Sequence, residues 1–338
     1  MHISKNRNTN KHCFFSGVLY SLGACFLWGL VFVVPQFLSQ YKDIEIVLGR
    51  YLIFGLASLI GALISNRNFF KMYSFKIWRT GFIWGVLTNP VYYLGIVIGL
   101  RYAGPAITVV MTGLTPLTVL FYSNLKSKEV PQVTVAIISV VVIGGVLLTN
   151  LSILEQPIIS TSFWKSIVGT ATVILSTVIW TLYIIKNGKF LEEHPEVNEL
   201  AWSYILGVST FFVTAPSFIV LNLCKVIDIK TLLSFSPEGR GSPYIIGILI
   251  LGICSSSLAG VCWNKASTRL SSSLLGSLLI FESLFGLLMY FFITTSLPTC
   301  VEGLGIVLMF GGSLYGLALF GKKSANKDKA SPSSIGNK

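Results

Sequence analysis

The sequence predicts an all-α integral membrane protein with ten transmembrane helices arranged as two inverted five-helix repeats. Three observations support this fold class. The chain is 53% hydrophobic and only 11% charged, whereas soluble domains carry about a quarter charged residues. Its apolar residues gather into stretches of about 20, the length that crosses a bilayer. Its two halves also share motifs at constant spacing.

Ten apolar stretches are long enough to span a membrane. They cover residues 15–38, 44–65, 77–100, 102–124, 132–151, 164–186, 199–222, 244–264, 271–293 and 302–321. Little chain remains between them for a soluble domain. We therefore divide the chain into a cytoplasmic N-terminal tail (1–14), a first repeat (15–151), a linker (152–163), a second repeat (164–321) and a disordered basic tail (322–338).

The formal net charge is +12, and the basic residues lie mainly in tails and short loops. A membrane explains this placement better than a nucleic-acid partner, which we do not expect. With ten spans, most Lys and Arg residues fall on the side of both tails. The opposite side holds Lys42, Arg101, Lys165, Lys225, Lys230 and Arg240. The positive-inside rule then predicts a multi-pass protein of the cell inner (plasma) membrane with both termini in the cytoplasm.

The two halves align at two constant spacings. The first pairs Pro131 with Pro298, Gly144-Gly145 with Gly311-Gly312, and Thr88-Asn89-Pro90 with Ser255-Ser256-Ser257; the second pairs Trp28 with Trp180 and Gly55 with Gly207. Because five is odd, two five-helix units in one chain must have opposite topology. Inverted repeats are common in secondary transporters, with the substrate site near the bilayer midplane.

Several short motifs in this order resemble the ten-helix EamA-like branch of the drug/metabolite transporter superfamily. They are Leu27-Trp28-Gly29, Gly49-Arg50-Tyr51, Leu114-Thr115-Pro116-Leu117 with Lys128-Glu129, Trp180-Thr181-Leu182-Tyr183 and Phe281-Glu282-Ser283-Leu284. Ser283 departs from the family's usual proline. Residues 294–298 lack its usual acidic residue. The resemblance covers about residues 15–321 and implies transport of metabolites, amino acids or drugs, driven by a proton gradient or by exchange.

Glu282 is the strongest candidate for a substrate-binding or coupling residue. It lies about 12 residues into its predicted helix, or ~18 Å at 1.5 Å per residue, near the middle of a ~30 Å core. An ionisable residue at that depth is by default functional. It could carry a proton or face a cationic substrate. The alternative is a carboxylate that hydrogen-bonds to a neighbouring helix.

Arg50 is the second intramembrane charge. It could pair with Glu282 or hold a substrate carboxylate. Alternatively, its long side chain could extend to the outer interface.

The aligned triplets place polar groups at matched depths, which suits a cavity lining or hydrogen bonds between helices. Tyr92 and Tyr93 share that level and could stack on a flat or cationic substrate. Most other aromatic residues suit interfacial belts or packing. The predicted substrate-binding or coupling residues are Glu282, Arg50, Asn89, Thr88, Ser256, Tyr92, Tyr93, Trp28 and Thr115.

The sequence favours a transporter over an enzyme. It contains no phosphate-binding loop of the GxxxxGK[ST] type. The predicted spans contain no His or Asp, so we expect no catalytic site, metal or cofactor. A structural membrane protein is the other alternative, and the intramembrane Glu282 and Arg50 argue against it. The sequence leaves open whether Cys224 and Cys300 pair, and whether the protein is a monomer or a homodimer.

Within its superfamily the chain looks most like the S-adenosylmethionine exchangers of intracellular bacteria. That resemblance implies import of S-adenosylmethionine in exchange for S-adenosylhomocysteine. A sulfonium would suit Glu282 and aromatic faces, and a carboxylate would suit Arg50. Proton-coupled export of aromatic or other amino acids is the alternative.

Overall fold

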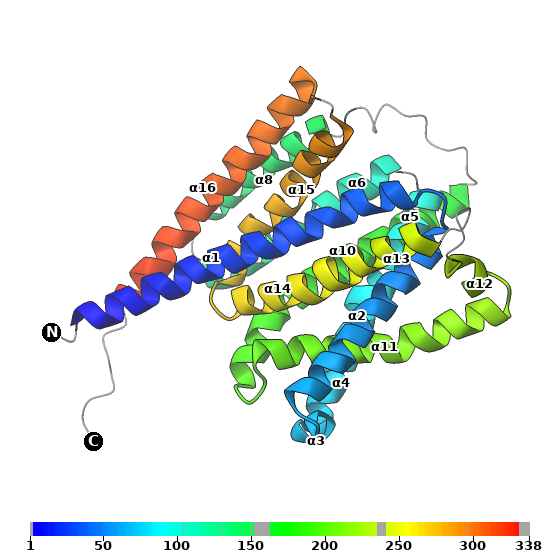
Figure 1. The fold of residues 1–338 in the computed structure, drawn as a ribbon. Coiled ribbons are helices and arrows are strands. Elements are labelled where there is room, and N and C mark those ends of the chain that lie inside the picture. The colour runs from blue at the N-terminus through cyan, green and yellow to red at the C-terminus, as the bar shows by residue number, and fades with distance from the viewer. Residues whose placement is uncertain are drawn as a thin grey trace.

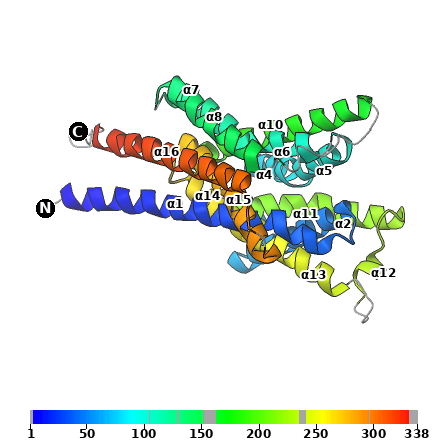
Figure 2. The same ribbon diagram turned by 90° about the horizontal axis from the view of Figure 1, so that it is seen from above.

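The structure is a computed structural model that describes residues 3–103, 105–128, 130–149, 151, 163–234, 241–295 and 297–330. This part of the chain is helical and contains no strand. The helices pack side by side into one bundle (Figures 1 and 2). The all-α class predicted from the sequence is therefore confirmed.

The first half of the chain comprises α1 (Ile3–Val33), η1 (Val34–Leu38), α2 (Asp43–Ser65), α3 (Phe69–Met72), α4 (Phe75–Val86), η2 (Leu87–Val91), α5 (Tyr92–Tyr102), α6 (Pro105–Gly113), α7 (Thr115–Ser127) and α8 (Gln132–Thr149). The second half comprises α10 (Phe163–Glu193), α11 (Glu199–Leu223), α12 (Ile229–Leu232), α13 (Gly241–Leu249), η3 (Ile250–Leu258), α14 (Ala259–Ser267), α15 (Ser272–Thr294) and α16 (Cys300–Ala330).

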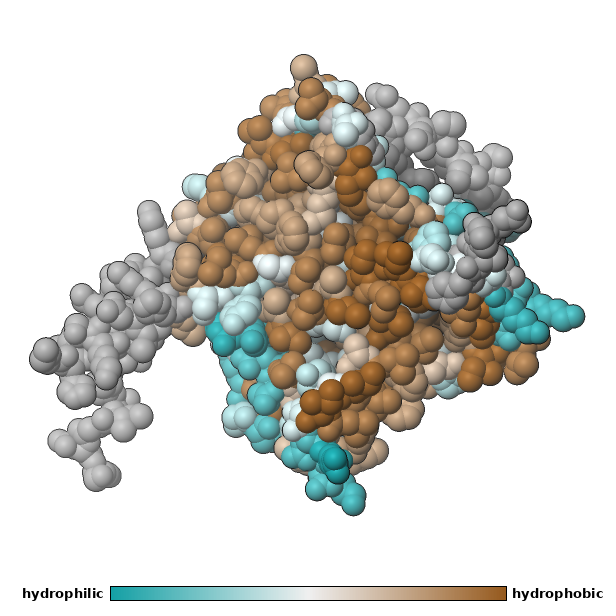
Figure 3. Space-filling model, viewed as in Figure 1, coloured by the Kyte–Doolittle hydropathy of each residue, from teal (hydrophilic) through white to brown (hydrophobic). Residues whose placement is uncertain are grey.

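Nine helices in the described part of the chain are long and apolar enough to cross a membrane. They correspond to every predicted span except 102–124. The face shown in Figure 3 carries a broad hydrophobic area, with hydrophilic residues gathered toward its edges. Large apolar side chains of the spanning helices, such as Phe212 and Phe292, are 60% and 85% exposed. A surface of this kind suits contact with lipid.

The predicted span 102–124 is present as two shorter helices, α6 and α7, which are interrupted at Leu114. Pro116 occupies the first turn of α7. Proline is favoured there because it has no N–H to donate and disfavours a helical conformation in the residue before it. Neither piece alone is long enough to span a bilayer, so the ten-helix count remains a prediction.

The chain ends are also more helical than predicted. α1 begins at Ile3, within the predicted tail 1–14, and α16 continues to Ala330, beyond the predicted end at 321. Alanine and lysine in residues 322–330 favour continuation of the helix. Residues 331–338 and most of the predicted linker lie outside the described residues.

Two of the spanning helices, one in each half of the chain, contain a π-helical segment at equivalent positions. η2 lies between α4 and α5, and η3 lies between α13 and α14. The aligned triplets of the sequence fall within them: Thr88-Asn89-Pro90 in η2 and Ser255-Ser256-Ser257 in η3. Such segments occur frequently at functional sites.

The aligned glycine pairs lie at a contact between the two halves, where α8 packs along α16 (Figure 1). A Cβ atom on Gly145 would lie 2.8 Å from the Gly305 carbonyl oxygen, and one on Gly312 would lie 2.7 Å from Val142. Their neighbours Gly144 and Gly311 face open space. The same member of each pair therefore makes the close contact, as expected for related halves. The inverted orientation of the halves remains a prediction.

α1 begins and α16 ends at the same end of the bundle, which we call the terminal end. Gly17 of α1 contacts Arg269 and Leu270 between α14 and α15. Gly316, late in α16, contacts Ser277 early in α15. The loop between α10 and α11 lies at the same end, because α11 begins with Glu199, which pairs with Arg269. Figures 1 and 2 show α1 beginning and α16 ending on this side.

Candidate functional site

A cavity of about 700 Å³ lies among the helices and is lined by residues of both halves. Pockets that hold small molecules have volumes of about 300–1,000 Å³. The structure brings all nine predicted site residues to its wall: Trp28, Arg50, Thr88, Asn89, Tyr92, Tyr93, Thr115, Ser256 and Glu282. Their roles in binding or coupling remain predictions.

Arg50 is held inside the bundle. Its side chain is on α2 and only 8% exposed. Nε donates to Ser256 Oγ at 2.9 Å, and one terminal nitrogen donates to the Ser255 carbonyl oxygen at 3.5 Å. The guanidinium also lies over the rings of Tyr51 and Tyr93, at 5.1 and 5.8 Å. The alternative in which Arg50 extends to the outer interface is therefore wrong for this structure. A guanidinium has five N–H donors, so further donors remain for a ligand.

Glu282 lines the cavity from α15. Among the described residues, no hydrogen bond or ion pair joins its carboxylate to a protein group. The anticipated pair with Arg50 is not formed, and neither is the anticipated hydrogen bond to a neighbouring helix. Placing a charged side chain at the centre of a membrane-spanning helix costs about 2.5–3.5 kcal/mol on insertion scales. Arg50 and Glu282 thus line one cavity without a direct ion pair between them.

The π-helical segment η3 explains how Arg50 is held. A π-helix bonds each N–H to the carbonyl five residues earlier, which disturbs the regular hydrogen-bond pattern. The Ser256 and Ser257 hydroxyls donate to the carbonyl oxygens of Leu251 and Gly252, both at 3.1 Å. The Ser255 hydroxyl donates to the Leu27 carbonyl oxygen of α1 at 2.8 Å. The serines thereby satisfy the backbone of η3 and connect it to α1 and α2.

The polar residues of η2 have a different arrangement. The Thr88 hydroxyl donates to the Trp84 carbonyl oxygen at 2.6 Å. Asn89 Nδ2 donates to the Gly85 carbonyl oxygen at 2.9 Å and to Thr210 Oγ1 of α11 at 3.1 Å. Asn89 thus makes a hydrogen bond between two helices, which was one of the two alternatives for the aligned triplets. Its Oδ1 accepts no hydrogen bond from the described residues and remains available to a ligand.

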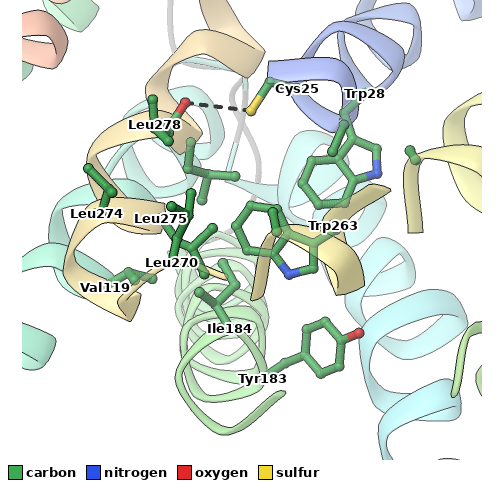
Figure 4. Packing of buried hydrophobic residues seen from close by; sticks show 14 of the residues in the cluster. Cys25, Trp28, Val119, Tyr183, Ile184, Trp263, Leu270, Leu274, Leu275 and Leu278 are labelled. Atoms are coloured by element: carbon green, nitrogen blue, oxygen red, sulfur yellow. Dashed lines mark hydrogen bonds between the residues drawn. The ribbon is translucent and has the colours of Figure 1, made fainter. Parts of the chain in front are cut away.

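Aromatic rings form a continuous part of the cavity wall. The ring centre of Trp28 lies 5.2 Å from that of Trp263 and 5.7 Å from that of Trp180. Trp180 lies 5.2 Å from Tyr92 and 5.6 Å from Tyr183. Figure 4 shows Trp28 and Trp263 next to each other, with Tyr183 beyond them. Such a wall can stack on a flat ring or attract a cation.

Sequence reasoning assigned Trp180, Tyr183 and Trp263 to packing or interfacial belts, yet they line the cavity. The internal alignment carried a signal for one of them, because Trp180 is the equivalent of the candidate Trp28. No such signal existed for Trp263.

The described residues contain no group of three His, Cys, Asp or Glu side chains placed to hold a metal ion. Cys224 and Cys300 are both free and exposed, so the disulfide left open by the sequence is not formed here.

Within the described ranges, the fold combines nine candidate membrane-spanning helices with a cavity of a size that suits a small molecule. Residues 15–151 match the EamA-like transporter family. The inner membrane protein YtfF of Escherichia coli (strain K12) is 26% identical over 304 residues, which are 88% of this chain and 93% of YtfF. Both comparisons agree with the resemblance to EamA-like transporters that the sequence motifs carry.

A solved structure, described only as a crystal structure of a protein, has the same fold. It superposes with a TM-score of 0.67 at 18% identity, over 91% of this chain and 98% of that one. At this identity the likeness concerns the fold alone. None of the comparisons bears on the resemblance to S-adenosylmethionine exchangers.

Proposed function

We propose that the chain is a secondary transporter that moves a small organic molecule across the inner (plasma) membrane. One observation carries the proposal: Arg50 and Glu282 line the same cavity without forming an ion pair. Charges inside a membrane are costly and typically mark substrate or ion pathways. A purely structural protein would gain nothing from leaving them apart. The match to EamA-like transporters and the inner-membrane relative YtfF support the same conclusion.

The cavity chemistry favours a molecule with a negative group, a positive group and a flat ring. The unused N–H donors of Arg50 suit a carboxylate, which forms short, charge-assisted hydrogen bonds with guanidinium. Glu282 suits a cation. The wall formed by Trp28, Trp180 and Tyr92 suits a ring, and each cation–π contact there contributes about 0.5–2 kcal/mol.

S-adenosylmethionine is the specific substrate that we propose. It carries an amino-acid carboxylate, a sulfonium and an adenine ring, one for each part of the cavity. Its neutral thioether product, S-adenosylhomocysteine, keeps the ring and the amino-acid group. Exchange of one for the other would need no separate coupling ion.

Proton-coupled export of an aromatic amino acid is the second candidate. A Glu282 carboxylate with no protein partner can take up and release a proton within the cavity. An aromatic amino acid also carries a carboxylate, an ammonium group and a ring. The two candidates differ in coupling and in the size of the ring system.

The deciding measurement is uptake of labelled S-adenosylmethionine by cells that express the protein. Accumulation above control cells that unlabelled S-adenosylhomocysteine abolishes, and phenylalanine does not, supports the exchanger. No accumulation, with the protein verified in the membrane, rejects this substrate. Export of aromatic amino acids that collapses with the proton gradient would then establish the second candidate. If the protein shows neither activity across a wider metabolite panel, the structural role is favoured.

A further inference from the structure

The cavity is lined by buried residues toward the terminal end and by more exposed residues toward the other end. Ser203, Trp263 and Asn264 line it on the terminal side and are 4%, 1% and 1% exposed. On the opposite side its lining includes Phe32 and Tyr290, which are 50% and 39% exposed. A ligand could therefore enter from the end away from the termini, and a barrier separates it from the terminal end.

A buried amide network forms the inner layer of this barrier. Asn187 Nδ2 of α10 donates to Asn264 Oδ1 of α14 at 2.8 Å. Asn264 Nδ2 donates to Ser203 Oγ of α11 at 2.8 Å, and Trp202 Nε1 of α11 donates to Asn187 Oδ1 at 2.8 Å. Each of the four side chains is less than 5% exposed. Three helices are thus joined at one point by hydrogen bonds whose partners would be costly to leave unpaired.

A second layer lies nearer the surface. Arg269 Nη1 contacts Glu199 Oε1 at 3.1 Å, and the Thr268 hydroxyl donates to the same oxygen at 2.9 Å. Both ionic side chains are 25% exposed. An ion pair so accessible to water contributes little by itself, so the buried amides are the stronger element.

The first half of the chain shows that the repeat fold does not require the amide network. α10 and α14 pack against each other, whereas the equivalent helices of the first half, α1 and α5, do not pack in this way among the described residues. The alignment that pairs Trp28 with Trp180 places Arg50 opposite Trp202, and the alignment of the triplets places Val97 opposite Asn264. The amide network is therefore not a requirement of the repeat fold, since only one half has it.

We propose that the Asn187–Asn264 pair is the gate at the terminal end, which must break before the cavity can open to that side. This inference rests on the proposed transport function. The amide network joins α14 to α11. α14 packs on α1, and α11 packs on α2 and α4. Breaking two amide hydrogen bonds would let these two groups of helices separate. Intact, the network holds the protein open toward the opposite end.

The test measures access to the cavity from each side. Ser283 lines the cavity and is not among the barrier residues described above, so Ser283→Cys reports the accessibility of the cavity to a membrane-impermeant maleimide. Labelling is quantified by mass spectrometry of the peptide that contains residue 283, in vesicles of either orientation. With Asn187 intact, we expect labelling only from the open side. Adding Asn187→Ala should raise labelling from the terminal side at least about tenfold.

Asn124→Ala is the matched control. Asn124 is also a buried amide, with two hydrogen bonds to the backbone of Val130, but it does not line the cavity. It should leave the labelling pattern unchanged. If Asn187→Ala fails to fold, Asn264→Ala removes the other partner of the same hydrogen bond and should shift labelling in the same direction.

Labelling from the terminal side that stays unchanged in both folded gate variants would overturn the proposal. Equal changes in the Asn124→Ala control would also overturn it, because general loosening would then explain the result. The measurement needs no substrate. A gate that opens in a protein without transport activity would therefore contradict the proposed function and not the gate.

Discussion

Arg50 Nε of α2 donates to Ser256 Oγ of η3 across 2.9 Å, which joins the first half of the chain to the second. Both residues are buried and both line the cavity. The hydrogen bond fixes the direction of the guanidinium, because Nε lies next to the rigid planar group that carries the remaining donors. Under the proposed function, recognition of an anion by Arg50 thus depends on a serine that need not touch the anion.

Loss of this hydrogen bond should weaken substrate binding. Ser256→Ala removes the acceptor and leaves the charge of Arg50 in place. A hydrogen bond to a charged group contributes about 1.5–3 kcal/mol, so KM for transport should rise roughly tenfold or more while the maximal rate changes little. Arg50→Lys should raise KM further, because an ammonium group cannot hold Ser256 and a carboxylate in the same planar geometry.

Ser257→Ala is the control for that measurement. The Ser257 hydroxyl donates to the Gly252 carbonyl oxygen within the same π-helical segment, whereas Arg50 donates to Ser256 and Ser255. Its KM should stay within about twofold of the parent value. A similar rise in both variants would assign the effect to η3 as a whole.

Glu282→Gln should reduce transport at least about tenfold, because glutamine keeps the shape of the side chain and removes its charge. The measurement is uptake normalised to folded protein in the membrane. Glu192→Gln, at an exposed position of α10, should transport normally. Near-normal transport in Glu282→Gln would remove this carboxylate from the mechanism.

The adjacent glycines of α8 should respond in opposite ways to alanine. Gly145→Ala would place a methyl group 2.8 Å from the Gly305 carbonyl oxygen, and such overpacking typically costs about 1–3 kcal/mol. Gly144→Ala faces open space and should gain up to about 1 kcal/mol from helix propensity. Thermal unfolding in detergent compares them. Equal Tm values would show that α8 and α16 do not pack as described.

Reporter fusions test the predicted orientation. Reporters after Phe70, Ser127 and Glu192 and at the C-terminus should all indicate the cytoplasm, because the basic residues concentrate on that side. A fusion after Lys225 should indicate the opposite side. A non-cytoplasmic signal at the C-terminus would refute the ten-helix count.

Hydropathy predicted much of the fold. Nine of the spans agree with the structure because lipid-facing helices need a long run of apolar residues, which is visible in any sequence. The break at Leu114 was not predicted, because hydropathy does not report helix continuity. Extension of α1 and α16 beyond the bilayer was also missed, because polar residues of good helix propensity look the same in a tail and in a helix.

The cavity was predicted through charge and repeat alignment. Glu282 and Arg50 stand out because ionisable residues are rare inside spans. Their separation could not be foreseen, since it depends on how η3 presents Ser255 and Ser256. Asn187 and Asn264 were missed for another reason. Each is a single amide near the end of its helix, and only the packing of α10 against α14 brings them together.

The π-helical turn in η3 also determines how α14 is rotated about the helix axis relative to α13. Such a turn is equivalent to one residue inserted into an α-helix, and each residue rotates a helix by about 100°. Removing one residue from η3 would therefore turn α14 by that angle relative to α13. Trp263 and Asn264 would rotate away from the cavity although neither side chain had changed. The composition of this site thus depends on a residue count as well as on residue identities.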